Sequence, residues 1–147
     1  MLFRSCSTQP IFYKGGIHIW IRSYDYDNAN LMILLSYIML GHPAWKKSDI
    51  RIFQIYQEEQ FESLRKAQEE LLNIGRLPIT KNNIEWIREE PHISFKSLVN
   101  ERSKNAGLTL IGFGVEQAKH DGKELFLGYD QIGQTLFIHS NQVLDIS

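Results

Sequence analysis

Residues 17–53, IHIWIRSYDYDNANLMILLSYIMLGHPAWKKSDIRIF, decide the fold of this chain. Two runs rich in isoleucine and aromatic residues, which favour β-strands, lie at the ends of this stretch. The first covers residues 17–21, and the second begins at residue 50 and continues to residue 56. Between them, a polar turn over 23–30 leads into the apolar segment Leu31–Leu40, which predicts a buried helix. Strand, helix and strand in this order form one βαβ unit and predict a parallel sheet.

The apolar segment Leu31–Leu40 is too short to cross a membrane. A transmembrane helix needs roughly 20 consecutive apolar residues, whereas this run stops at Gly41-His42-Pro43 and follows Asp25 and Asp27. We therefore expect a helix in the interior of a globular domain, and no direct insertion of this chain into a membrane.

Composition narrows the class of protein. The chain has 147 residues, of which 43% are hydrophobic and 22% charged, and these values suit one globular domain. A formal net charge of −1 offers no basic surface, so we expect no nucleic-acid partner. The single cysteine, Cys6, cannot form a disulfide within the chain and favours a reducing compartment. The first residues lack the apolar core of a signal peptide, so we expect a cytoplasmic location.

The chain divides into a short arm and one domain. Residues 1–16 show no clean periodicity and contain Pro10 and Gly15-Gly16, which predicts a lead-in arm. Residues 17–147 alternate between strand-like and helix-like patterns and are expected to form a single α/β domain. After the first βαβ unit we expect a helix over 61–72 capped by Gly75, a strand over 77–79 or 84–87, a helix from the N-cap Ser94 to Gly107, a strand over 108–114, a helix over 123–132 and a strand over 135–139.

This alternation predicts a three-layer, doubly wound α/β fold, with a mainly parallel sheet and helices on both faces. In such sheets the ligand crevice lies beyond the carboxyl ends of the strands, where the strand order reverses. A flavodoxin-like order would put that point between the first strand and the strand over 108–113. The candidate crevice residues are Arg22, Ser23, Asp25, Asp27, Gly112 and Gly114.

Two groups of these candidates also have a purely structural explanation. Asp25 and Asp27 precede the apolar helix, where carboxylates stabilise a helix N-terminus, and we favour a cap at Asp27 or Asn28 over a ligand contact. The glycines of Gly112-Phe113-Gly114 would let backbone N–H groups approach a phosphate. A dinucleotide fingerprint needs a third glycine, however, and the nearby Glu116 would repel an anion. A tight turn is therefore the favoured interpretation of this loop.

The residues give no pattern for catalysis or metal binding. The five histidines are scattered without the i, i+4 spacing of a zinc-protease pair, and no Gly-x-Ser-x-Gly motif is present. Cys6 lies on the predicted arm, where nothing would hold a base against it. We expect neither an enzyme nor a bound metal or cofactor. His18 is expected to point away from the face that Ile17 and Ile19 share, toward a polar contact.

An ordered set of segments resembles the cytosolic C-terminal region of cation-chloride cotransporters, of the Na-K-Cl and K-Cl type, and of related bacterial permeases. The resemblance covers most of the chain from about Gly15 onward, and its departures include the absence of the membrane part and a short connector over 76–91. The segments that carry it are Ile17-His18-Ile19-Trp20, Leu31–Leu40, Trp45, Ile50–Phe53, Leu98–Ser103 with the strand Leu108–Gly114, and Leu136–Leu144.

The resemblance implies a non-catalytic cytosolic regulatory domain, similar in fold to universal stress proteins, that pairs with a second copy or a second α/β half and regulates a membrane transporter. The helix Leu31–Leu40 has more apolar surface than one sheet can cover, so Met32, Tyr37 and Met39 are expected at an interface. The alternative is a stand-alone protein, resembling universal stress proteins, that binds a nucleotide beside Arg22 and Gly112.

Overall fold

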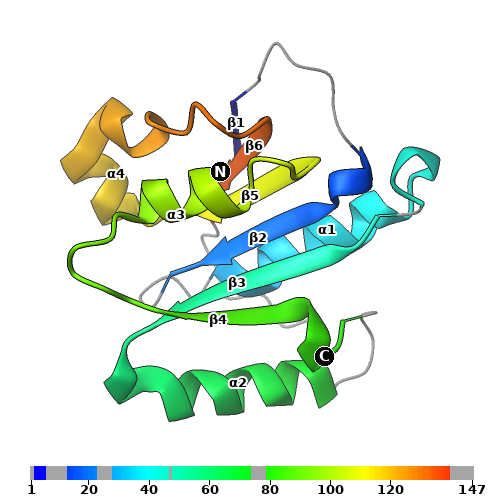
Figure 1. Cartoon of the computed structure of the whole chain (residues 1–147), viewed down its shortest axis with the longest axis horizontal. Coiled ribbons are helices and arrows are strands. Elements are labelled where there is room, and N and C mark those ends of the chain that lie inside the picture. The colour runs from blue at the N-terminus through cyan, green and yellow to red at the C-terminus, as the bar shows by residue number, and fades with distance from the viewer. Residues whose placement is uncertain (1, 6–12, 23–27, 47, 74–78, 140–147) are drawn as a thin grey trace.

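A computed structural model describes residues 2–5, 13–22, 28–46, 48–73 and 79–139 of the chain. Six strands form one sheet in the order β1-β6-β5-β2-β3-β4, and every pairing is parallel except the antiparallel pair β1 and β6 (Figure 1). The predicted doubly wound, mainly parallel α/β sheet is therefore confirmed. The strands are β1 Leu2–Ser5, β2 Ile17–Ile21, β3 Ile50–Tyr56, β4 Ile84–Arg88, β5 Leu108–Gly112 and β6 Gln134–Ile138.

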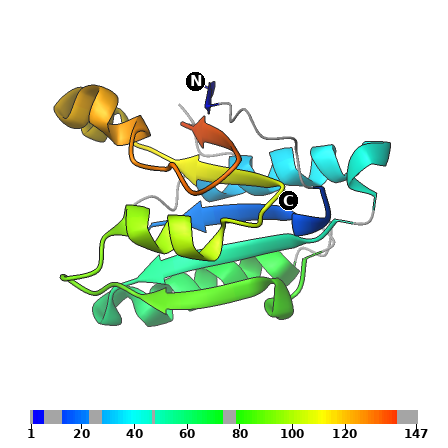
Figure 2. The same cartoon turned by 45° about the horizontal axis from the view of Figure 1, so that its top comes forward.

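Helices cover both faces of the sheet. Side chains of α1 and α2 pack in one apolar cluster, and side chains of α3 and α4 pack in another cluster across the sheet. Figure 2 shows α3 on one side of the sheet and both α1 and α2 on the other. The helices are α1 Ala29–Leu40, α2 Phe61–Asn73, α3 Phe95–Arg102 and α4 Val115–Asp121.

The strand order differs from the flavodoxin-like order that the sequence analysis assumed. Counted among themselves in chain order, the five parallel strands run 3-2-1-4-5, because the chain steps outward twice, from β2 to β3 to β4, before it returns to the other side of β2. Right-handed crossovers then place α1 and α2 on one face and α3 and α4 on the other. The reversal point still lies between β2 and β5, as expected.

Two predicted boundaries are wrong. Part of the expected arm belongs to the sheet, because Leu2–Ser5 pairs as β1 with β6 and covers what would otherwise be an unpaired edge. The helix expected over 123–132 instead lies earlier, as α4, and ends where Gly122 takes a positive φ of 56°. A 3₁₀ turn over Gly122–Phe126 follows, so the apolar residues of this region pack from a turn rather than from a helix.

The predicted cap of α3 is confirmed, and the connector before this helix contains one of the two predicted strands. Ser94 caps α3, since its Oγ accepts a hydrogen bond from the backbone N–H of Ser97 at 3.0 Å, although the helix ends at Arg102, before Gly107. The uncertain connector contains a strand at Ile84–Arg88, while Ile79 is buried in the core. The predicted cap Gly75 lies outside the described residues, as do residues 77 and 78.

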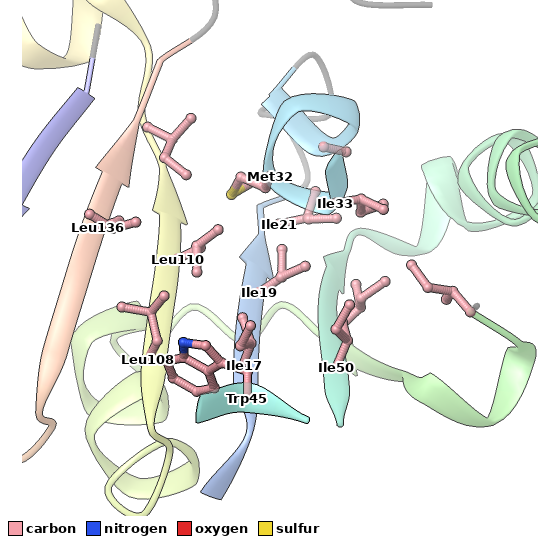
Figure 3. Close-up of a cluster of buried hydrophobic side chains, with 14 residues drawn as sticks. Ile17, Ile19, Ile21, Met32, Ile33, Trp45, Ile50, Leu108, Leu110 and Leu136 are labelled. Carbon is pink, nitrogen blue, oxygen red and sulfur yellow. The ribbon is translucent and has the colours of Figure 1, made fainter. Parts of the chain in front are cut away.

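Strand β2 lies at the centre of the sheet and is covered on both faces. Ile17, Ile19 and Ile21 are fully buried and point toward α1, whose Met32 and Ile33 meet them (Figure 3). The face toward α3 carries Trp20, which stacks on Phe53 of β3 with ring centroids 4.3 Å apart and planes inclined by 12°. Burial on both faces explains why Trp20 lies among the isoleucines of this strand, at a position where a solvent-exposed face would carry a polar residue.

One buried hydroxyl joins β2 to the end of α3. Ser103 is fully buried, its Oγ accepts a hydrogen bond from Trp20 Nε1 at 2.8 Å, and it lies 2.8 Å from His18 Nδ1. A buried indole N–H needs such a partner, because leaving it unpaired costs free energy. Ser103 therefore fixes the position of α3 over the centre of the sheet.

We predict that Ser103→Ala lowers the free energy of unfolding by about 1–3 kcal/mol, because the Trp20 N–H loses its acceptor in a buried site. Urea denaturation measures the change. The matched control is Ser63→Ala, the same substitution at an exposed position of α2, which should cost less than about 0.5 kcal/mol. Equal losses in the two variants would contradict the role assigned to Ser103.

Candidate functional site

The structure places half of the expected crevice residues. Arg22 follows β2, Gly112 ends β5, and Gly114 precedes α4, so all three lie at the carboxyl ends of neighbouring strands or just beyond them. Ser23, Asp25 and Asp27 lie outside the described residues. The predicted ligand site can therefore be assessed at its two sides, the glycine loop and Arg22.

The backbone of Phe113, in the middle of the glycine loop, is already hydrogen bonded within the protein. The N–H of Phe113 donates to the carbonyl of Ile138 at 2.9 Å, and the carbonyl of Phe113 accepts from Asn28 Nδ2 at 3.1 Å and lies 3.0 Å from His139 Nδ1. The following helix, α4, has seven residues and carries Glu116 in its first turn. This loop ties β5 to β6 and to the start of α1, and it is poorly suited to bind a phosphate.

Arg22 lies in an acidic and apolar pocket. Its guanidinium carbon is 3.8 Å from the centre of the Phe95 ring, a cation–π contact between the end of β2 and the start of α3. A pocket of about 100 Å³ here is lined by Arg22, Ile55, Glu89, Glu90, Ile93, Phe95 and Leu98. Two carboxylates accompany one guanidinium, so the electrostatic potential of this pocket does not favour an anionic ligand.

The cap expected at the start of α1 is only partly present. Asn28 occupies the N-cap position, as one of the two predicted alternatives, but its side chain makes no capping hydrogen bond. The side chain instead donates to the Phe113 carbonyl. Asn28 therefore joins α1 to the end of β5, across the point where the strand order reverses.

The exposed surface of α1 is apolar. The helix contains no charged residue, and Met32 is fully buried against β2, so the prediction that Met32 is an interface residue is wrong. Tyr37 is 45% exposed and Ile38 is 61% exposed, while Met39 packs partly against the core. Ile38 was not among the predicted interface residues. It lies one helical turn after Leu34 and next to Tyr37, opposite the buried Met32 and Ile33.

His18 makes the polar contact expected of it. It points away from the cluster that contains Ile17 and Ile19, lies beside the Ser103 hydroxyl and packs on the Phe53 ring with centroids 5.2 Å apart. Burial, with a smaller effect from the positive charge of Arg51, lowers the pKa of His18 from 6.5 to about 4. The side chain is thus a neutral hydrogen-bonding group of the β2–α3 contact at neutral pH.

The described residues form neither a metal-binding cluster nor a membrane-spanning helix. No group of three or more histidine, cysteine, aspartate or glutamate side chains in the described ranges is placed to hold a metal ion. Among the helices described, none has the length and apolar character needed to cross a membrane.

Comparison with known proteins adds no assignment. No protein-family model matches the sequence, and no curated protein does.

The His18 contact predicts a pH dependence of stability. Between pH 6.5 and about 4 the unfolded chain binds a proton at His18 that the folded chain does not, so the free energy of unfolding should fall as the pH is lowered. The contribution amounts to about 3 kcal/mol over this window. Urea denaturation of wild type and His18→Gln at several pH values measures it as the difference between the two proteins. A difference that does not change with pH would contradict the burial of a neutral His18.

Proposed function

We propose that this chain is a non-catalytic protein-interaction module that self-associates through α1. The observation that carries the proposal is the uncharged outer surface of α1, where Tyr37 and Ile38 remain exposed although the opposite side of the helix fills the core. Exposed apolar patches on a folded domain mark interaction sites, and interfaces are enriched in tyrosine and methionine.

A second copy of the chain is the partner that this surface fits best. Closed dimers use the same patch on both subunits, so each residue must tolerate its own counterpart nearby. A helix without charged side chains meets this condition, because two copies of α1 bring no like charges together. Tyr37 adds a large ring whose hydroxyl can stay at the rim of such an interface.

We further propose that the module is a cytosolic regulatory domain of a cation-chloride cotransporter-like membrane transporter, which acts by pairing or by docking to the transporter. The support is the ordered resemblance of Ile17–Trp20, Leu31–Leu40 and Ile50–Phe53 to that family's cytosolic region. The doubly wound α/β sheet agrees with the universal-stress-protein-like fold that the resemblance implies. In this proposal the transported ion is handled by the partner, not by this chain.

Sedimentation velocity over a range from low to high micromolar protein tests the self-association. Wild type is expected to dimerise, and Ile38→Lys is expected to weaken the dimer by about tenfold or more, because an unpaired charge would enter an apolar interface. A lysine near the C-terminal end of α1 also suits the helix dipole, so this variant should fold normally.

The control for this experiment is Leu127→Lys, which changes an equally apolar and similarly exposed side chain, 55% exposed, beyond α4. It should leave the dimer unchanged. A wild-type protein that remains monomeric at every concentration, or equal effects of the two lysines, would overturn the assignment of α1 as the interface.

The alternative function, nucleotide binding beside Arg22 and Gly112, predicts a different result in a thermal melt. A ligand that binds the native state at one hundred times its Kd stabilises the protein by about 2.7 kcal/mol, which corresponds to roughly 5–10 °C in Tm for a chain of this length. Because Phe113 N–H is already bonded and Glu89 and Glu90 line the Arg22 pocket, we expect millimolar MgATP to leave the Tm unchanged. A shift of that size would favour the nucleotide-binding alternative.

A further inference from the structure

Strand β4 leaves one side of its backbone unpaired at the edge of the sheet. It pairs with β3 alone, and no strand of the described residues lies beyond it (Figure 1). The N–H of Glu89 donates to the carbonyl of Tyr56 in β3, and successive residues of a strand face opposite neighbours. The backbone N–H and C=O groups of Trp86 and Arg88 therefore face outward, where another strand could pair with them, whereas the N–H of Ile84 already donates to the carbonyl of Lys81.

The same alternation puts the side chains of Ile84 and Trp86 beside α2. A pocket of about 150 Å³ lies between α2 and β4, with Leu72, Ile84 and Trp86 as its apolar part and Arg65, Gln68, Glu69 and Lys81 as its polar part. Trp86 is held in place by edge-on contacts with Phe61 and Tyr56, whose ring centroids lie 5.2 Å and 6.0 Å away. A helix beside an open sheet edge, with a preformed pocket between them, is suited to hold an extended peptide.

Charges around the pocket favour an acidic side chain. Arg65 is paired with Glu62 at 3.1 Å and with Glu69 at 2.9 Å. Lys81 makes only a long contact of 3.6 Å to the same Glu69 oxygen, and its side chain is 77% exposed. Lys81 is thus a cation at the rim that a ligand carboxylate could pair with.

The charged residues of β4 do not prevent another strand from pairing with its edge. Glu85 is bonded to Arg102 of α3 at 2.9 Å, and Arg88 is paired with Glu58 at 3.2 Å. Neither leaves an unpaired charge that would repel an incoming strand, and β4 contains no lysine or proline, the residues that commonly protect sheet edges.

We propose that β4 and the α2–β4 pocket bind an extended peptide segment of a partner protein, which adds to the sheet as an antiparallel strand. The peptide places an aliphatic side chain in the pocket on Leu72 and Trp86, and an acidic side chain two residues away beside Lys81. Two residues of spacing are required because alternate side chains of a strand share a face. This site is separate from the α1 surface and does not depend on dimerisation.

Fluorescence anisotropy of the full chain with the labelled, capped heptapeptide VTLTETV tests the proposal. In an antiparallel pair, residues whose side chains share the pocket face with Trp86 are those whose N–H groups face β4. N-methylation of the peptide leucine should therefore weaken binding by about tenfold or more. The matched control is N-methylation of the threonine between the leucine and the glutamate. Its N–H faces away from β4, so this modification should have little effect.

A charge exchange tests the contact with Lys81. Lys81→Glu should weaken binding of VTLTETV by about threefold to fivefold, in the range of an exposed ion pair, and should bind the lysine peptide VTLTKTV better than wild type does. Lys123→Glu, at an exposed position beyond α4, should change neither affinity. Ile38→Lys should also bind VTLTETV normally, which separates this site from the α1 interface.

No binding at millimolar protein would overturn the proposal, as would binding that N-methylation of the leucine does not weaken. Binding that survives that modification but responds to the Lys81 exchange would identify a simple electrostatic contact and would equally exclude strand addition.

Discussion

The double-sided burial of β2 is the constraint on which the rest of the structure depends. Its isoleucines fill the layer under α1, and Trp20 fills the layer under α3. Because β2 pairs in parallel with both β3 and β5, the chain has to leave it in one direction and return on the other side, which creates the reversal point of the sheet. The hydroxyl of Ser103 adds the polar contact that fixes α3 over this centre.

Elements with a strong local pattern could be predicted from the sequence. The βαβ unit, the buried helix α1 and the cap at Ser94 follow from hydrophobic runs and from one capping side chain. The strand β1 could not, because only its distant partner β6 gives Leu2–Ser5 a place in the sheet. The prediction of a helix over 123–132 was wrong because the helix of this region, α4, lies earlier and ends at Gly122.

The candidate site was predicted less well, for a physical reason. Glycines and an arginine at strand ends suggest an anion crevice, but whether their groups are free depends on contacts from distant residues. Asn28 and Ile138 bond the backbone of Phe113, and Glu89 and Glu90 accompany Arg22. The properties that remain for recognition are surface properties, the uncharged side of α1 and the unpaired edge of β4. Both favour proteins over small anions as partners, which is why we propose that the chain acts by binding other proteins.

Native mass spectrometry of the purified full chain tests whether the protein acts by self-association, since one spectrum records both the number of subunits and the mass of any retained ligand. We expect a dimer whose mass equals two chains, without an added small molecule. A monomer that carries the mass of a nucleotide would contradict it, and would return the crevice beside Arg22 and Gly112 to the centre of the function.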